Sequence, residues 1–292
     1  MTPPPFYTLT GNLLGERTLT LADWAPGRTQ RAIGETFQVG GKGINVAKML
    51  RRLGLSPIAL CFTGGHSGAE CSGWLRERGF DFRAFPSEKP TRQGTVVRSP
   101  GQRDTTFLGP DAPPGAAGIR ACAAYLDDQP ADGVLAVCGS LPGWETVAFD
   151  PLRAALERWL QRGRLIADTY GPPLAWFARR PLDLIKINRT EFEGLRIGPL
   201  DLRSTFPVRS WIITDGPQPV RIFDPAGNTS EMTPPPIREV SPTGSGDVLL
   251  ACLLAAHWHR SLPLAQALAF ALRYAAANAA DPGIAEFPLP AN

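Results

Sequence analysis

Short apolar runs alternate with helical patterns along the chain from residue 111 onward. Four runs stop at a polar or glycine-containing tip: residues 133–140, 164–170, 182–188 and 210–216. Amphipathic stretches such as 150–163 lie between them. Apolar strands that alternate with helices predict a doubly wound, mostly parallel α/β sheet with helices on both faces. Ligands bind beyond the carboxyl ends of such strands, so we expect the tips to line one edge. These tips are Ser140, Asp168, Asn188 and Gly216.

The first 110 residues follow a different pattern. Short alternations near the N-terminus and the segment 94–109 around Pro100-Gly101 predict strands and hairpins. Between them, Val46, Leu50 and Leu53 stand at helical spacing. The hairpins do not fit a parallel sheet. We therefore expect one domain over 1–292, in which segments of approximately 6–38 and 91–110 form a small β-sheet lid.

Composition excludes several classes of protein. The chain has 292 residues, 43% hydrophobic and 20% charged, as in ordinary globular proteins, and a net charge of +3 gives no support for nucleic-acid or membrane partners. The five cysteines lack metal-type pairing and indicate buried thiols in a reducing compartment. There is no signal-peptide pattern, and the apolar run 248–256 is too short for a bilayer. We predict a cytoplasmic protein.

The segment 241–258 places a glycine-rich turn and a carboxylate directly before an apolar helix. Amides at a helix N-terminus lack partners, and glycines let an anion approach them. A carboxylate in an anion site is explained if Asp247 takes a proton from a nucleophile while the amides of Gly244, Ser245 and Gly246 hold a phosphoryl group. The alternative is a glycine-rich cap whose Asp only complements the helix dipole.

A second glycine-rich turn, residues 40–43, also precedes a helix. It is not a Walker A loop, because the chain contains no G-x-x-x-x-G-K-[ST] string, and no G-x-G-x-x-G follows a strand. Two such turns at opposite ends of the chain suit two ligands that must meet.

The two turns together, GGKGINVAKMLRRLG and PTGSGDVLLACLL, resemble the signature regions of the ribokinase/PfkB family of carbohydrate kinases, and lean toward its 1-phosphofructokinase and tagatose-6-phosphate kinase branch. Shorter motifs agree in order: GGHSG (64–68), TR (91–92), CGSLPGW (138–144), ADTYG (167–171), IKINRTEF (185–192), TDG (214–216) and AAAN (275–278). The resemblance implies a doubly wound core, a β lid over the sugar, ATP as donor, Mg²⁺ as counter-ion and homodimers formed through the lids.

The resemblance also implies roles for individual residues. It makes Asp247 the base that deprotonates a sugar hydroxyl, with Gly244, Ser245 and Gly246 as the anion hole. The expected substrate-binding residues are Asn12, Glu16, Gly40, Gly41, Lys42, Asn45 and Arg92. Among these, Lys42 and Arg92 are candidates to clamp a phosphate already on the sugar, since two cations suit a dianion. A lysine or arginine taken alone is more often a solvated surface charge.

On the nucleotide side, the resemblance assigns Asn188 and Glu191 to Mg²⁺, largely through water. The same spacing is that of a helix capping box, and both can hold at once. The expected nucleotide-binding residues are Lys186, Asn188, Thr214, Gly216, Gly244, Gly246 and Asn278. Lys186 is equally well a solvent-facing strand end, and Asn278 a polar residue inside a helix.

Three departures from the family pattern leave details open. Glu16 stands where the branch has a substrate-gripping Asp, with one extra residue in the loop, so the sugar hydroxyls held are unknown. Ser241 replaces the Asp or Asn that opens the C-terminal signature, which leaves K⁺ activation open. Pro217 and Pro219 stiffen the nucleotide loop and leave nucleotide preference open.

The leading hypothesis is an ATP-dependent kinase of a sugar or sugar phosphate. One alternative is a kinase of an unphosphorylated sugar or a nucleoside, which Lys42 and Arg92 distinguish from the first. The other is a catalytically idle sugar or nucleotide sensor on the same scaffold, against which the retained Asp247 argues. The sequence does not specify the sugar, the hydroxyl or the oligomeric state.

Overall fold

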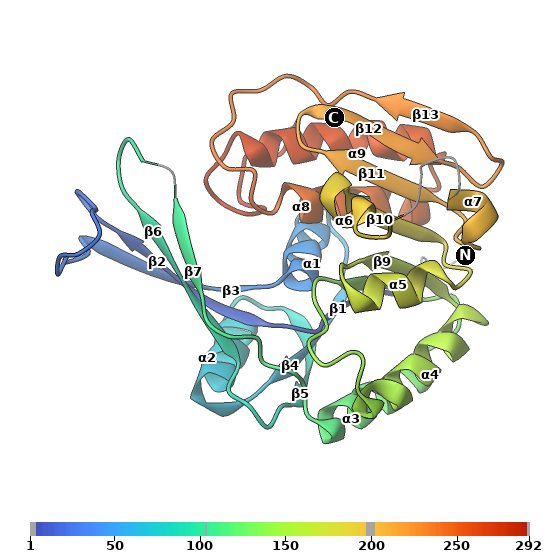
Figure 1. Ribbon diagram of the computed structural model, residues 1–292, viewed down its shortest axis with the longest axis horizontal. Helices are drawn as coiled ribbons and strands as arrows, with labels where there is room; N and C mark the ends of the chain where they lie inside the picture. Colours follow the sequence, from blue (N-terminus) through green and yellow to red (C-terminus); the bar gives the residue numbers. More distant parts are fainter. Residues whose placement is uncertain (1–3, 103, 197–201, 291–292) are drawn as a thin grey trace.

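A computed structural model describes residues 4–102, 104–196 and 202–290, and its centre is a nine-stranded sheet (Figure 1). In sheet order, the strands are β13 (Thr229–Met232), β12 (Gln218–Phe223), β11 (Trp211–Asp215), β10 (Leu184–Asn188), β9 (Arg164–Asp168), β8 (Val134–Cys138), β1 (Phe6–Thr10), β4 (Ile58–Thr63) and β5 (Asp81–Pro86). The strands from β11 to β5 run parallel, while β12 and β13 add an antiparallel edge. The carboxyl ends of the parallel strands therefore meet at one edge.

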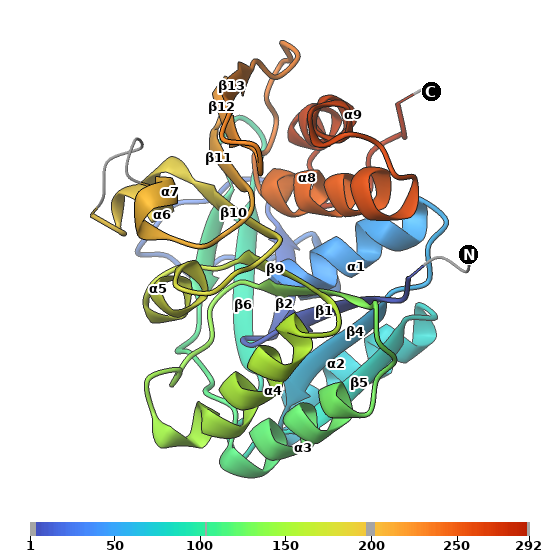
Figure 2. The ribbon, with the colours of Figure 1, turned by 90° about the vertical axis from the view of Figure 1, so that its right-hand side faces the viewer.

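Helices cover both faces of this sheet (Figure 2). One face carries α1 (Lys42–Arg52), α2 (Gly65–Glu77), α8 (Ser245–Leu254) and α9 (Leu264–Ala279). The other carries α3 (Ala116–Asp127), α4 (Asp150–Leu160) and α5 (Pro172–Ala178), with α6 (Arg189–Glu193) and α7 (Leu202–Thr205) beyond them. All five residues of β8 are buried, which explains why the central strands are apolar throughout rather than alternating. The predicted doubly wound α/β fold is confirmed.

The described residues also include a short 3₁₀ turn, Val147–Phe149, and a π-helix, Ala255–His259, that continues α8. Within the described residues, no helix combines the length and apolar content needed to cross a bilayer.

The lid is a separate four-stranded sheet that projects from the core (Figure 1). Its order is β3 (Gly34–Gly40), β2 (Leu14–Thr20), β6 (Arg92–Arg98) and β7 (Thr105–Leu108). The antiparallel pair β6–β7 confirms the hairpin expected around Pro100-Gly101. The first lid segment begins later than expected. Residues 6–10 form β1 in the middle of the main sheet, because all five side chains are buried there.

The register of the lid strands separates its two faces. Arg17 pairs with Phe37, and this face packs on α2, where Arg17 forms an ion pair with Glu70. Glu16 pairs with Gln38 on the opposite face. Arg92 lies on that face too, because it pairs with Leu14, which is two residues before Glu16 on the same strand. Side chains on the Glu16 face are therefore free of α2.

That second face is turned toward the core. Arg98, which lies on the same face of β6 as Arg92, places its guanidinium 3.5 Å from the carbonyl of Pro282, which lies beyond α9. The lid face that carries Glu16 and Arg92 therefore looks toward the side of the core that bears α8 and α9.

Candidate active site

The strand ends deliver a cluster of charged side chains beside the glycine-rich turn of α8. Ile166 and Leu184 are aligned in register on β9 and β10, and both pack on the face covered by α1 and α8. Two residues further, Asp168 and Lys186 emerge on the same face, as the two-residue period of a strand requires. Polar side chains were predicted at the carboxyl ends of the strands. Lys186, which lies inside β10 rather than at its end, joins them.

Asp168 is shared by two lysines. Its Oδ1 lies 2.8 Å from Lys42 Nζ and its Oδ2 lies 2.7 Å from Lys186 Nζ. Asp168 is fully buried, and Lys186 nearly so. Lys42 Nζ also approaches Glu191 Oε1 at 3.3 Å and the ring of Tyr170 at 5.6 Å. We call Lys42, Asp168, Lys186 and Glu191 the Asp168 cluster.

Asp247 stands next to this cluster and is held from across the chain. Its Oδ2 accepts a 2.7 Å hydrogen bond from Asn45 Nδ2 of α1, a residue 202 positions away. Asp247 is 6% exposed. The resemblance assigns Asn45 to the sugar; in the structure its amide orients the carboxylate of Asp247. The two glycine-rich segments therefore meet at one point, as two reacting ligands require.

The electrostatics of the two carboxylates differ because their neighbours differ. Burial opposes ionisation of Asp168, but the charges of Lys186 and Lys42 outweigh it and hold its pKa below the usual value. Burial, aided by the negative charge of Asp168, raises the pKa of Asp247 to about 6. Burial lowers the pKa of Lys42, but Asp168 and Glu191 reverse this and raise it. Near neutral pH, Asp247 is thus an ionised carboxylate that readily accepts a proton.

The turn before α8 has the backbone of an anion hole. Gly244 has a φ of +76°, and a Cβ there would lie 2.3 Å from Ile284. The amides of Gly244 and Gly246 donate to no other backbone group of the described chain, while that of Ser245 reaches the Pro242 carbonyl at 3.2 Å. Lys186 Nζ would lie 2.7 Å from a Cβ on Gly246, so a positive charge stands beside these free donors.

Asn278 braces this turn from behind. Its Nδ2 donates to the carbonyl of Thr243 at 3.0 Å and to Ser245 Oγ at 3.1 Å, and its Oδ1 accepts from the amide of Ala285 at 2.8 Å. The side chain is fully buried. The resemblance places Asn278 near the adenine; the structure gives it no exposed polar atom with which to contact a nucleotide directly.

The glycines before α1 serve packing. Gly41 has a φ of +114°, and a Cβ there would lie 2.6 Å from Thr10 Cγ2, while one on Gly43 would lie 2.4 Å from Thr10 Oγ1. They let the start of α1 approach β1 closely. Gly40, the last residue of β3, is less restricted, since a Cβ there would come no closer than 3.6 Å to any neighbouring atom. Lys42 lies between Gly41 and Gly43, so the close packing of these glycines on β1 directs the Lys42 side chain toward Asp168.

A second polar cluster lies at the base of the lid. Asn12 Nδ2 donates to Asp111 Oδ1 at 2.7 Å and to Ser140 Oγ at 3.0 Å, and Arg92 Nη1 reaches the same Asp111 oxygen at 3.2 Å. We call these four residues the Arg92 cluster. The expected pair of phosphate clamps is thereby divided, because Lys42 pairs with Asp168 and Arg92 with Asp111. Glu16 accepts a 2.6 Å hydrogen bond from Gln38 Nε2 on the same lid face.

The N-x-x-E element forms a complete capping box. Asn188 Oδ1 accepts from the amide of Glu191 at 2.8 Å, and Glu191 Oε2 accepts from the amide of Asn188 at 2.9 Å. In the described part of the chain, no three His, Cys, Asp or Glu side chains converge as metal ligands. Carboxylate and amide oxygens already engaged in this way fit an outer-sphere role, in which Mg²⁺ keeps its waters.

The loop that the resemblance assigns to the nucleotide begins at the end of β11. Thr214 is the register partner of Asn188, and its hydroxyl lies 3.4 Å from the carbonyl of Ile187. Gly216, with a φ of +55°, has nothing within 4 Å of a Cβ position. Both predicted residues therefore lie beside Asn188, at the edge where the parallel strands end.

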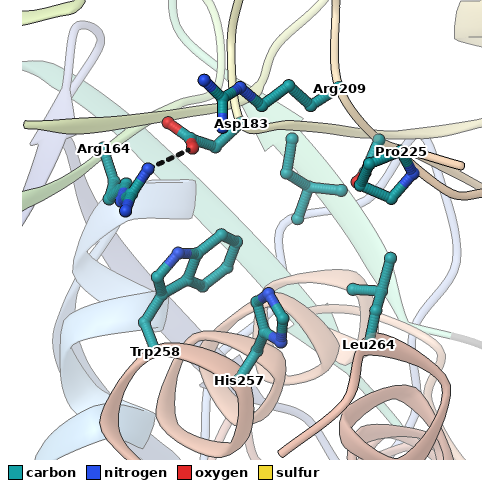
Figure 3. A pocket seen from close by; sticks show the side chains of 9 residues that line it. Arg164, Asp183, Arg209, Pro225, His257, Trp258 and Leu264 are labelled. Carbon is teal, nitrogen blue, oxygen red and sulfur yellow. Dashed lines mark hydrogen bonds and ion pairs between the residues drawn. The ribbon is translucent and has the colours of Figure 1, made fainter. Parts of the chain in front are cut away.

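Two cavities border the sheet at different edges. One of about 690 Å³ is lined by Tyr170, Asn188, Glu191 and Phe206, so it adjoins the Asp168 cluster. The other, of about 290 Å³, lies at the amino ends of the strands, where Arg164 and Asp183 pair at 3.2 Å above the π-helix (Figure 3). Its lining contains none of the predicted site residues.

Comparison with known proteins agrees with this geometry. The model of the pfkB family carbohydrate kinases matches residues 14–127 and 179–292, well over half of the chain. The chain belongs to the pfkB family. Both glycine-rich turns, Arg92, Asp111 and Asp247 lie within the matched segments. It is therefore a sugar kinase, a phosphotransferase with an alcohol group as acceptor, whose family uses ATP.

Two relatives of this pfkB kinase match over most of their length. It is 25% identical over 262 residues to ATP-dependent 6-phosphofructokinase isozyme 2 of Escherichia coli, covering 85% of this chain and 84% of that protein. It is 29% identical over 265 residues to 1-phosphofructokinase of Xanthomonas campestris, covering 85% and 83%. The crystal structure of Escherichia coli phosphofructokinase-2 in complex with potassium superposes with a TM-score of 0.85 at 21% identity, over 96% of this chain and 94% of that one.

The sequence did not identify two charged residues, Asp168 and Asp111, as members of the candidate site. Asp168 is recognisable as a polar strand tip, and its place in the ADTYG motif is the available signal, but nothing in the sequence shows that it joins two lysines. Asp111 gives no signal, because it lies in an irregular loop between β7 and α3.

We expect Gly244→Ala to destabilise the fold more than Gly216→Ala. Both residues have positive φ, which costs an alanine roughly 1 kcal/mol, but only Gly244 also meets a side chain, Ile284. The overpacking should add about 1–3 kcal/mol. Urea denaturation of both variants measures the difference, and equal losses would show that Ile284 yields without cost.

We expect Asp168→Asn to lower the free energy of unfolding by about 3–5 kcal/mol, because it leaves the buried Lys186 without its counter-ion. The matched control is Asp127→Asn, which removes a more exposed ion pair with Arg158. That change should cost less than about 1 kcal/mol. Thermal and urea unfolding at neutral pH compare the two, and a similar small loss in both would contradict the structural role of Asp168.

Proposed function

We propose that this pfkB kinase transfers the γ-phosphate of ATP to a hydroxyl of a sugar or sugar phosphate, with Asp247 as the general base. The observation that carries the proposal is the position of Asp247, whose ionised oxygen and the free amides of Gly244 and Gly246 share one turn. The names of the relatives, 6-phosphofructokinase and 1-phosphofructokinase, support fructose phosphates as the first substrates to test.

The reaction requires the sugar hydroxyl, the carboxylate of Asp247 and the γ-phosphate of ATP to come together. The sugar hydroxyl gives its proton to Asp247 as its oxygen forms a bond with the γ-phosphorus, and the bond from that phosphorus to the β,γ-bridging oxygen of ATP breaks, leaving ADP. Negative charge on the transferred group meets the amides of Gly244 and Gly246 and the ammonium of Lys186. Asn45 keeps the carboxylate of Asp247 oriented during the transfer.

Asn188 and Glu191 are the residues that would hold Mg²⁺ through its water shell, where it would neutralise phosphate charge. Asp168 does not compete for that role, since both of its oxygens already accept from lysines. Thr214 and Gly216 are proposed to border the nucleotide. The potassium complex is a property of the Escherichia coli protein, and no residue here is assigned to that ion.

The lid is proposed to close over the sugar and to take part in self-association. Its Glu16 and Arg92 share the face turned toward the core. Ile33 and Phe107, 71% and 54% exposed, offer apolar contact surface around the lid. The solved tetrameric inhibited form of Escherichia coli phosphofructokinase-2 shows that a protein of this fold can oligomerise.

We expect Asp247→Asn to lower kcat by roughly 10²–10⁴-fold, the usual contribution of a positioned base. The same change should stabilise the protein at about pH 8 by about 1–3 kcal/mol, because it removes a buried charge whose folded pKa lies above its unfolded one. Coupled ADP-formation assays and thermal unfolding measure both effects, with Asp127→Asn as control. Full turnover in Asp247→Asn would exclude this residue as the base.

We expect kcat/KM to fall as the pH drops through about 6, because the base is then protonated. The profile should be flat above that pH until other groups titrate. In Asp168→Asn the acid limb should move to lower pH, since Asp247 loses a negative neighbour and keeps two positive ones. Steady-state rates measured from about pH 5 to about pH 8, the range that brackets such a titration, test this. An unmoved limb would show that Asp168 does not influence the base.

A further inference from the structure

Asp111 is a carboxylate placed where a sugar phosphate would be expected to meet its cation. Its Oδ1 is 3.2 Å from Arg92 Nη1 and 2.7 Å from Asn12 Nδ2. Asn12 follows the central strand β1 and Arg92 opens the lid strand β6, so Asp111 bridges core and lid. The guanidinium that was predicted to clamp a substrate phosphate already has an anion.

Arg92, Asn12 and Asp111 differ in how far they are exposed to solvent. The Arg92 side chain is 15% exposed and Asn12 is 4% exposed, whereas the Asp111 side chain is 59% exposed. Arg92 and Asn12 are therefore held in place, while Asp111 can leave its partners at little cost in packing. An exposed carboxylate that neutralises a partly exposed cation acts as a competitor for any other anion that approaches that cation.

The charge balance of the lid base does not favour a dianion. Lys42, the second expected clamp, lies between Asp168 and Glu191 and contributes no free charge. Arg92 is neutralised by Asp111, and Glu16 adds a negative charge on the same lid face, where it accepts a hydrogen bond from the neutral Gln38. A phosphate entering here meets two carboxylates and one cation that is already paired.

The unsatisfied hydrogen-bonding atoms of the Arg92 cluster also favour a hydroxyl over a phosphate. Asn12 Oδ1 and Arg92 Nε are buried and have no partner among the described residues, which leaves one acceptor and one donor unsatisfied in the Arg92 cluster. A sugar hydroxyl both donates and accepts, so it can satisfy either atom once the cluster adjusts to a ligand. A phosphate dianion only accepts, so it can satisfy Arg92 Nε but not Asn12 Oδ1, and its oxygens would repel both Asp111 and the Asn12 oxygen.

We propose that Asp111 is a specificity-determining residue: it competes with a substrate phosphate for Arg92, and so biases this subsite toward the hydroxyls of an uncharged sugar. This inference rests on the proposed function, because it assumes that the Arg92 cluster contacts the sugar. It predicts that removing the charge of Asp111, without changing its size, frees Arg92 for a phosphate.

The test is the affinity of Asp111→Asn for fructose 6-phosphate and for fructose, measured by calorimetry without ATP. Asp111→Asn should bind fructose 6-phosphate roughly ten-fold more tightly than the unmodified chain, an effect typical of removing one nearby charge. Its affinity for fructose should change less than about two-fold, since fructose carries no charge. The gain should shrink at about 1 M salt, where the screening length is only ~3 Å.

The control is the same substitution in an Arg92→Gln background, where freeing the cation is no longer possible. There, Asp111→Asn should leave the affinity for fructose 6-phosphate unchanged. Equal changes for both sugars, no gain for the phosphate, or a gain that persists without Arg92 would each overturn the proposal. ADP formation is measured separately, so a chain that shows the affinity shift but no turnover would contradict the proposed function and leave the role of Asp111 standing.

Discussion

The site depends on one buried carboxylate that is shared by two lysines. Asp168 has no exposed surface, and its two oxygens hold Lys42 of α1 and Lys186 of β10 at 2.8 and 2.7 Å. Three elements are thereby joined at the edge where ligands bind. An unpaired charge at this depth would cost several kcal/mol, so neither Asp168 nor Lys186 can leave alone. Lys42 is partly exposed, and without it Asp168 would still be paired with Lys186. The arrangement fixes a positive charge beside the free amides of the α8 turn without exposing it to solvent.

The same carboxylate shapes the chemistry of its neighbour. Asp247 is also buried, but its direct partner is the neutral amide of Asn45, so burial and the charge of Asp168 raise its pKa, while that of Asp168 falls. Two acids a short distance apart thus acquire different tasks, one structural and one suited to accept a proton. Keeping a carboxylate ionised inside the protein costs stability. Asn278 braces the turn from which Asp247 projects by hydrogen bonds to the carbonyl of Thr243 and the hydroxyl of Ser245.

Periodicity along the chain predicted the fold well, because parallel strands buried on both faces produce apolar runs that few other structures explain. It also placed Asp168 at the functional edge. It could not show that Lys42 and Asp168 pair, since they are 126 residues apart and the pairing depends on how closely α1 packs on β1. The first lid segment was placed too early for a related reason. The alternation of β1 resembles that of a hairpin, and only its neighbours β4 and β8 show that both of its faces are covered.

The division of the two expected phosphate clamps follows from the same kind of long-range pairing. A lysine after a glycine-rich turn and an arginine at the start of a lid strand look equivalent in sequence, as two cations available to one dianion. In the structure, each has its own carboxylate, from β9 in one case and from the loop after β7 in the other. The first carboxylate is fully buried and cannot be displaced, whereas the second is mostly exposed and can. The charge of Lys42 is therefore fixed by the fold, whereas the role proposed for Asp111 leaves the charge of Arg92 for a ligand to change.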